Sequence, residues 1–206
     1  MKRRILWCIL CVCLASTSLF AQEPALLSRV HDTEACRKWV DGQMEKMTLK
    51  QKVGQLFIYT LQPVTNQYSK NVLRKMVDDY GVGGLLFTGG ELRKQVQMTN
   101  YAQAHASVPL MVTFDGEWGL GMRLKDTPSF PYNRVLGCIQ NDSLLYEYGK
   151  EVARQCRLIG VQINFAPVAD VDNNPNNPVI NFRSFGSDPK RVAEKVAAYV
   201  KGLEDN

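Results

Sequence analysis

Short apolar runs alternate with stretches of helical spacing along most of this 206-residue chain, and this alternation limits the folds open to it. Each run is apolar at successive positions, as in a strand that is buried on both faces. Strands that alternate with helices pair in parallel, because each helix returns the chain to the same end of the sheet. The predicted strands occupy residues 56–60, 84–88, 109–115 and 161–166, and the helices that follow them occupy residues 71–80, 91–106, 143–158 and 189–203.

The alternation therefore predicts an α/β fold with about four β/α units. Two architectures fit: an open doubly wound sheet, or half of an eight-stranded TIM-type (β/α) barrel. The first helical turns contain neither G-x-G-x-x-G nor G-x-x-x-x-G-K-[ST], which disfavours a nucleotide-binding sheet. Before the first strand, residues 34–46 predict a surface helix, and Thr48 is placed to cap a second short helix.

Residues 1–21 have the layout of a secretory signal peptide. Basic residues at positions 2–4 precede an apolar run at 5–14, and we expect cleavage after Ala21. The apolar run has about half of the roughly 20 residues that a bilayer-spanning helix needs. An uncleaved anchor is the alternative. The protein is therefore expected to be secreted, or periplasmic in a bacterium, with no stable membrane insertion after cleavage.

The charge of the chain gives no reason to expect a nucleic-acid partner. Its formal net charge of +5 includes three cationic residues of the leader and falls to +2 without them. So small and dispersed a charge does not neutralise a phosphate backbone.

The cysteines do not predict a disulfide scaffold or a zinc site. Three of the six lie in the leader, and the others, Cys36, Cys138 and Cys156, have no C-x-x-C spacing. Cys138 and Cys156 lie in apolar or helical surroundings, which predicts buried thiols. A single bridge remains open as an alternative.

Polar loops follow the predicted strands, and in such folds function lies just beyond the carboxyl ends of the strands. After the third strand, Asp115 opens a loop interrupted by glycines, and Arg123 returns a positive charge eight residues later. With Trp118, this carboxylate and guanidinium suit a sugar, through hydrogen bonds to hydroxyls and ring stacking. The alternative is a salt bridge within the loop and a tryptophan that only packs.

The loop after the fourth strand offers two further candidates. Asp170 and Asp172 suggest either a pair of catalytic carboxylates or Asx turns that hold an irregular loop, and we favour the turns. Arg183 follows in a segment rich in Asn and Pro and suggests a second guanidinium that faces a ligand. The alternative, a capped helix start at 187–189, is compatible with this role because Arg183 precedes the cap.

Together these stretches resemble glycoside hydrolase family 3, from about residue 40 to the end of the chain. Arg183-Ser-Phe-Gly is more similar to the β-N-acetylglucosaminidase (β-hexosaminidase) branch than to the β-glucosidases. One departure is Trp118, which stands where the usual loop has the first of two glycines. The matching stretches are Met47-Thr-Leu-Lys-Gln-Lys-Val-Gly-Gln-Leu56, Gly83-Gly-Leu-Leu-Phe, Asp115-x-Glu-x-Gly-x-x-x-Arg123, Asn164-Phe-Ala-Pro-Val-x-Asp-Val, Asn-Pro-x-Asn-Pro-Val-Ile, and the long and highly specific Arg-Ser-Phe-Gly-x-Asp-Pro189.

The resemblance implies a (β/α)8 TIM-type barrel, of which residues 47–206 are the first half after the signal peptide and a helical lead-in at 22–46. It implies that Asp115, Arg123 and Arg183 bind hydroxyls of the terminal sugar. The full-length enzyme would hydrolyse terminal non-reducing β-N-acetylhexosamine residues of an N-acetylglucosamine-containing glycan with retention, and no metal or organic cofactor is implied.

The resemblance also implies that the catalytic residues are missing from this chain. A Lys-His pair, a His proton donor and an Asp nucleophile would all follow Asn206, so we expect the chain alone to be inactive. His31 precedes the barrel, and His105 lies in a helix away from the strand ends. Neither Asp115 nor Glu117 is expected to be the nucleophile, because the family pattern makes Asp115 a ligand for hydroxyls.

Other functions stay open at this point. A family 3 β-glucosidase or β-xylosidase would differ in the motif expected downstream. A non-catalytic carbohydrate-binding module would bind sugar without turnover, and a periplasmic solute receptor is disfavoured by Arg-Ser-Phe-Gly. Four strands alone would leave two open edges and one uncovered face, which predicts marginal stability.

Overall fold

The computed structural model describes residues 33–205, and both the predicted signal peptide and residues 22–32 of the lead-in lie outside that range. The chain divides into two units, residues 1–42 and 43–206. Helix α3 (Thr33–Lys46) confirms the predicted surface helix, with Glu34 in its first turn and Lys46 in its last, where the helix dipole favours each charge. Within the described residues, no helix has both the length and the apolar character that crossing a membrane requires.

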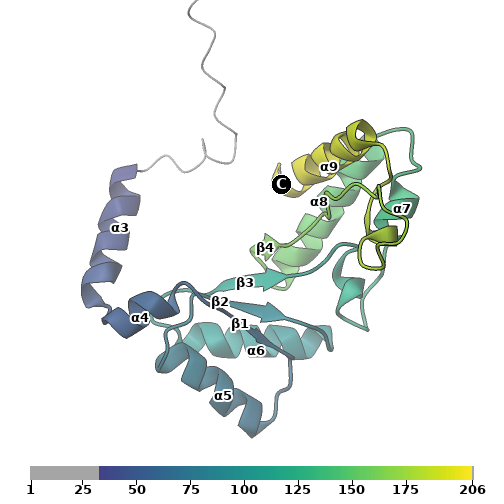
Figure 1. Cartoon of the computed structure of the whole chain (residues 1–206). Helices are drawn as coiled ribbons and strands as arrows, with labels where there is room; N and C mark the ends of the chain where they lie inside the picture. The colour runs from purple at the N-terminus through teal and green to yellow at the C-terminus, as the bar shows by residue number, and fades with distance from the viewer. Residues whose placement is uncertain (1–32, 206) are drawn as a thin grey trace, which may run out of the picture. The chain divides into compact units, whose positions relative to one another are not determined.

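Four parallel strands form one sheet in the order β1-β2-β3-β4, which confirms the predicted α/β fold (Figure 1). Strands that are neighbours in sequence are neighbours in space, so the order does not reverse as it does in a doubly wound sheet. Right-handed crossovers then place the connecting helices on one face of the sheet. The strands are β1 (Ile58–Leu61), β2 (Gly84–Phe87), β3 (Met111–Phe114) and β4 (Ile163–Asn164).

The helices agree with the predicted ones to within a few residues. The two long helices after β3 and β4 match most closely, the first to the residue and the second within one residue at its end. The long loop after β3 also holds two short helical turns, η1 and α7, that the sequence did not indicate. The helical elements after α3 are α4 (Leu49–Gly54), α5 (Gln67–Asp78), α6 (Leu92–His105), η1 (Leu120–Met122), α7 (Asn133–Leu136), α8 (Ser143–Leu158), η2 (Asn181–Arg183) and α9 (Pro189–Glu204).

Side-chain caps fix where two of these helices begin. Thr48 caps α4 as predicted: its side chain accepts from the Gln51 N–H, and the Gln51 side chain accepts from the Thr48 N–H at 2.9 Å. Helix α5 begins at Gln67, four residues before the predicted start at 71. The reason is Asn66, whose Oδ1 accepts a hydrogen bond from the Ser69 N–H at 2.8 Å.

The first strand begins two residues later than predicted. Leu56 and Phe57 belong instead to the turn that ends α4, since the Phe57 N–H donates to the Gly54 carbonyl at 2.9 Å. Their side chains are 84% and 61% exposed. An apolar run therefore overestimates the strand here, because it also includes residues that lie on the surface of the described chain.

The core lies between the sheet and the helices that cover it. Alternate residues of the middle strands point into it, and α5 and α6 lie together on one face of the sheet (Figure 1). The fully buried apolar residues of these elements are Leu73, Leu85, Phe87, Met98, Val112 and Phe114.

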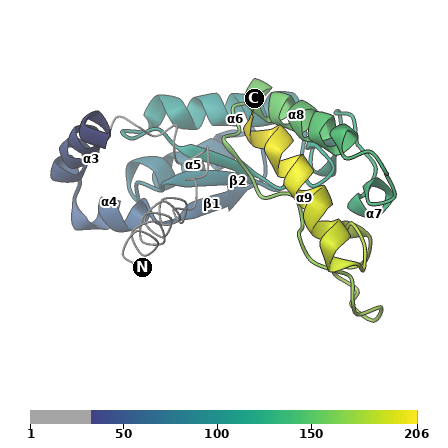
Figure 2. The ribbon, with the colours of Figure 1, turned by 90° about the horizontal axis from the view of Figure 1, so that it is seen from above.

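Helices α8 and α9 pack against each other through two glycines (Figure 2). A Cβ atom on Gly149 would collide with the carbonyl oxygen of Tyr199, and one on Gly202 would collide with that of Tyr146. Next to this crossing the rings of Tyr148 and Tyr199 stack with their centroids 4.9 Å apart. The two backbones thus approach more closely than any other residue type would allow.

We expect Gly149→Ala to lower the free energy of unfolding by about 2 kcal/mol, because the added methyl group forces the two helices apart. The matched control is Gly42→Ala, also within a helix, where a Cβ would meet nothing within 4 Å. Alanine should leave stability there unchanged or slightly higher, because it favours helix more than glycine does. Urea unfolding followed by circular dichroism measures both, and equal losses in the two variants would contradict the packing argument.

All three described cysteines are free thiols. Cys156 is buried as predicted, and burial raises the pKa of its thiol to about 11. The prediction for Cys138 was wrong, because its side chain is exposed. It follows α7, a short helix at the surface of which only Asn133 and Leu136 are buried, so apolar neighbours in sequence did not indicate burial.

Candidate functional site

Asp115 and Arg123 form an ion pair at the carboxyl end of the sheet. Asp115 directly follows β3, and Nη2 of Arg123 lies 2.7 Å from its Oδ2. Both side chains are partly exposed, at 28% and 30%, so the pair is open to a ligand. The loop between them turns at Gly119, whose φ of 78° favours glycine. The structure therefore brings two of the three predicted site residues together.

Neighbouring elements hold this loop on both sides. Asn164, at the end of β4, accepts from the Gly116 N–H at 2.8 Å and donates to the Gly116 carbonyl at 3.4 Å. On the other side, the Gly90 N–H donates to the Arg123 carbonyl at 3.1 Å, and the Lys125 N–H donates to the Gly90 carbonyl at 3.1 Å. The backbone that carries the ion pair is thus fixed by the loop after β2 and by the last residue of β4.

Arg183, the third predicted site residue, reaches the same loop through Glu117. Its Nε lies 3.0 and 3.1 Å from the two carboxylate oxygens of Glu117, and its Nη2 lies 2.7 Å from Oε1. Glu117 is only 3% exposed, whereas the Arg183 side chain is 29% exposed. A buried carboxylate therefore orients a guanidinium whose outer edge faces solvent.

Carboxylates around Arg183 define the electrostatics of the site. The hydrogen bond from Arg183 to Glu117 is the main reason that the pKa of the guanidinium is raised above its usual value, although burial opposes it. The negative charges of Asp170 and Asp115 raise this pKa further. Asp115 and Arg183 thus lie within electrostatic reach of each other, so the predicted residues belong to one cluster.

Hydrogen-bond capacity remains on this cluster. An arginine carries five N–H donors. Arg183 uses three of them, two toward Glu117 and one toward the Val179 carbonyl at 3.3 Å. Arg123 uses one N–H of Nη2 toward Asp115, and its side chain is 30% exposed although its Nε is buried. Cationic donors beside the Asp115 carboxylate suit the hydroxyl groups of a polyol, which both donate and accept.

Glu117 is the site residue that the sequence did not reveal. The loop after β3 holds two acidic residues within three positions but only one arginine, and a buried carboxylate needs a partner. That imbalance was the available signal. Its backbone is fixed as well, since the Tyr148 hydroxyl donates to the Glu117 carbonyl at 2.9 Å. Burial raises the pKa of this phenol, so Tyr148 keeps its proton.

Asp172 has a different partner from the one predicted for it. Its carboxylate forms an ion pair with Arg134, which also donates to the Asn181 carbonyl at 3.0 Å. The side chain therefore ties its loop to α7, which contains Arg134, rather than closing an Asx turn.

Asparagines close the turns of the following segment instead. Asn174 and Asn177 accept hydrogen bonds from backbone N–H groups two residues later, at 3.1 and 2.9 Å. The predicted helix start is confirmed, because Asp188 caps α9 by accepting from the N–H groups of Lys190 and Arg191.

His105 lies at the opposite end of the sheet from this cluster. It ends α6, which runs back to the amino ends of the strands, and its Nδ1 lies 2.7 Å from the Tyr101 carbonyl oxygen. His31 is outside the described residues. Among residues 33–205, no three or more His, Cys, Asp or Glu side chains are arranged to hold a metal ion.

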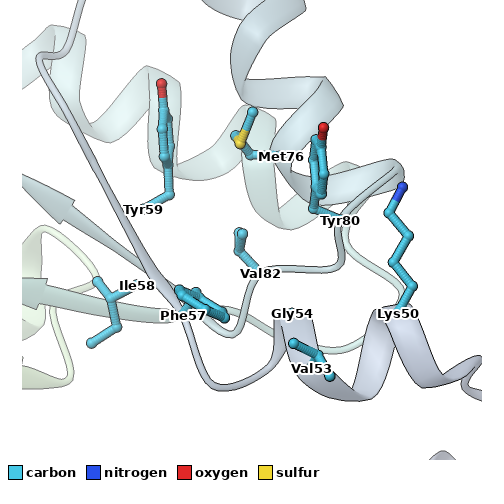
Figure 3. A pocket seen from close by; sticks show the side chains of 9 residues that line it. All are labelled: Lys50, Val53, Gly54, Phe57, Ile58, Tyr59, Met76, Tyr80 and Val82. Atoms are coloured by element: carbon cyan, nitrogen blue, oxygen red, sulfur yellow. The ribbon is translucent and has the colours of Figure 1, made fainter.

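A cavity of about 520 Å³ also lies at the amino ends of the strands, and none of the residues that line it belongs to the ion pairs. Figure 3 shows the side chains that line it. Its walls come from α4, the start of β1, the end of α5 and the residues before β2. The Lys50 ammonium lies over the Tyr80 ring, 4.4 Å from the ring centre. The lining residues are Lys50, Val53, Gly54, Phe57, Ile58, Tyr59, Met76, Tyr80 and Val82.

Comparison with known sequences gives one family. The glycosyl hydrolase family 3 N-terminal domain matches residues 48–206. Beta-hexosaminidase A of Pseudoalteromonas piscicida is 31% identical over 145 residues, which cover 64% of this chain and 24% of that protein. Beta-hexosaminidase LpqI of Mycobacterium tuberculosis is 34% identical over 139 residues, which cover 63% and 34%. The chain thus spans about a quarter to a third of the length of these curated relatives.

Solved structures of glycoside hydrolase family 3 are also similar to this chain. A glycoside hydrolase family 3 beta-N-acetylglucosaminidase from Paenibacillus sp. FPU-7 is 31% identical with a TM-score of 0.68, over 77% of this chain and 31% of that one. M. tuberculosis LpqI is 30% identical with a TM-score of 0.67, over 80% and 47%. The beta-glucoside phosphorylase BglX shares the fold at 21% identity and a TM-score of 0.73, over 82% and 30%.

Proposed function

We propose, because this chain belongs to the N-terminal domain family of glycosyl hydrolase family 3, that the whole protein removes terminal non-reducing β-linked N-acetylhexosamine from glycans. The observation that carries this proposal is the cluster of two Arg–carboxylate pairs at the carboxyl end of a parallel sheet. Relatives named beta-hexosaminidase support the substrate class.

In this proposal the residues of this chain bind and orient the terminal sugar. Asp115 accepts hydrogen bonds from sugar hydroxyls, and Arg123 and Arg183 donate to hydroxyl oxygens through the N–H groups that the protein leaves unused. Hydrolysis with retention also needs a nucleophile and a proton donor on opposite sides of the scissile bond. We assign both to the part of the whole protein beyond residue 206.

We further propose that residues 47–206 are the first half of a (β/α)8 barrel. The sequential strand order supports this, since barrel strands follow one another around the axis. The segment before β1 supports it as well: Val53 of α4 and Leu56 and Phe57 of the following turn are exposed apolar residues, and Val53 and Phe57 also line the cavity of Figure 3. Later β/α units of the whole protein would cover this surface.

The leader supports export as part of the same proposal. A basic start, a short apolar run and a cleavage site after Ala21 would send the protein to the periplasm or outside the cell. Glycans that contain N-acetylglucosamine are then the expected partners.

The whole protein is expected to cleave 4-nitrophenyl N-acetyl-β-glucosaminide with a higher kcat/KM than the corresponding β-glucoside or β-xyloside, whereas residues 22–206 alone are expected to cleave none of them. Release of nitrophenol measures both. A preference for the glucoside or xyloside would assign the protein to another branch of the family. Saturable sugar binding without turnover would make it a carbohydrate-binding module.

A further inference from the structure

Three aromatic side chains gather directly beside the ion pair of Glu117 and Arg183. Trp118 follows Glu117 in the chain, Phe182 precedes Arg183, and Tyr132 precedes α7. The ring centres of Trp118 and Tyr132 are 4.7 Å apart with the planes at 90°. Those of Tyr132 and Phe182 are 4.6 Å apart, and those of Trp118 and Phe182 are 6.5 Å apart. Two parts of the long loop after β3 and the η2 turn thus contribute one ring each to a single cluster.

Hydrogen bonds to backbone carbonyls fix the segments that carry these rings. The Phe130 N–H donates to the Trp118 carbonyl at 3.1 Å, which links the first loop to the segment of Tyr132. Nδ2 of Asn133 donates to the Arg183 carbonyl at 2.8 Å, which links that segment to the loop of Phe182. The cluster is therefore held in place before a ligand arrives, which lowers the entropy cost of binding.

Two of the three rings are exposed to solvent, and Trp118 is half-buried. Tyr132 is 45% exposed and Phe182 is 41% exposed. Core aromatics of the same unit differ, since Tyr148 and Tyr199 stack with both rings buried. An exposed aromatic group that adjoins a polar, charged cluster is the usual composition of a ligand site, where apolar surface supplies contact and a few polar groups fix orientation.

We propose that Trp118, Tyr132 and Phe182 form a stacking platform for the second sugar of the substrate, the one released as the leaving group. This inference rests on the proposed function. The faces of a pyranose ring carry C–H groups that pack on aromatic rings, while its hydroxyls stay in water. Trp118 and Phe182 are the chain neighbours of Glu117 and Arg183. When Arg183 binds the terminal sugar, the second sugar of the glycan therefore lies over these rings.

The test uses the whole protein and two substrates that differ only in the leaving group. N,N′-diacetylchitobiose releases a sugar that reaches the platform, and methyl N-acetyl-β-glucosaminide releases methanol, which does not. Trp118→Ala and Phe182→Ala are expected to raise KM for the disaccharide about five- to tenfold, with KM for the methyl glycoside unchanged. The control is Tyr68→Ala on α5, whose side chain is 77% exposed, and it should alter neither KM.

Equal increases of KM for both substrates, or no increase for either, would overturn the platform. A second measurement separates this outcome from failure of the proposed function. Tryptophan fluorescence of the whole protein, read on rapid mixing before turnover, should change with the disaccharide but not with free N-acetylglucosamine, and Trp118→Phe should abolish the change. If neither glycoside is hydrolysed, the proposed function fails, and this titration alone decides the platform: the platform stands if the change occurs and falls if it does not.

Discussion

Replacing Arg183 with methionine is expected to lower the free energy of unfolding by about 3 kcal/mol, the lower end of the range for breaking a buried ion pair. The cause is the partner that remains: Glu117 is 3% exposed and would keep a buried carboxylate without its cation. The lower end applies because the Arg183 side chain is 29% exposed. Urea unfolding of the wild type and the variant measures the loss.

Two further variants separate burial from geometry. Arg154 donates two hydrogen bonds to the Glu151 carboxylate, of 2.6 and 2.7 Å, but these side chains are 56% and 36% exposed. Arg154→Met should therefore change stability far less. Glu117→Gln combined with Arg183→Met should recover part of the loss, because no charge is left buried. Equal losses in both arginine variants would show that burial of Glu117 does not set the cost.

Asp142→Ala is the second substitution expected to be costly, again by about 3 kcal/mol. Lys195 of α9 is only 2% exposed, and its ammonium contacts the Asp142 carboxylate and the Ile139 carbonyl. Removal of the carboxylate leaves a buried ammonium with a single neutral acceptor. Chemical unfolding of the variant at neutral pH measures this loss directly.

The reverse substitution is the matched control. Lys195→Met leaves Asp142, which is 38% exposed and stays hydrated, while the methionine fills the space of the lysine stem. It should cost much less than Asp142→Ala, although both remove the same ion pair. If Lys195→Met proved the more destabilising of the two, the burial argument would be wrong.

Long amphipathic helices were predictable from the sequence, whereas element boundaries that a cap or a turn sets were less so. The extent of α8 was predicted to the residue because sixteen residues of regular spacing leave little ambiguity. The start of α5 was missed because the Asn66 cap precedes the apolar pattern. The first strand was misplaced because Leu56 and Phe57 are apolar but belong to a turn.

The site shows the same division between local and distant information. Asp115 and Arg123 lie eight residues apart in one loop, so their pairing could be anticipated. Glu117 and Arg183 lie 66 residues apart, and only the order of strands in space brings them together. No local pattern in the sequence contains that order, and so the residue that holds Arg183 was not identified.

The close packing of α8 and α9 at their glycines has a consequence for local unfolding of the site. Residues 159–188, which include β4 and Arg183, leave one of these helices and return to the other. Local unfolding that separates the helices would therefore release the binding arginine as well, so that helices and site open as one cooperative unit. A sugar bound to Arg183 would in turn protect the backbone amides of two helices that it never touches.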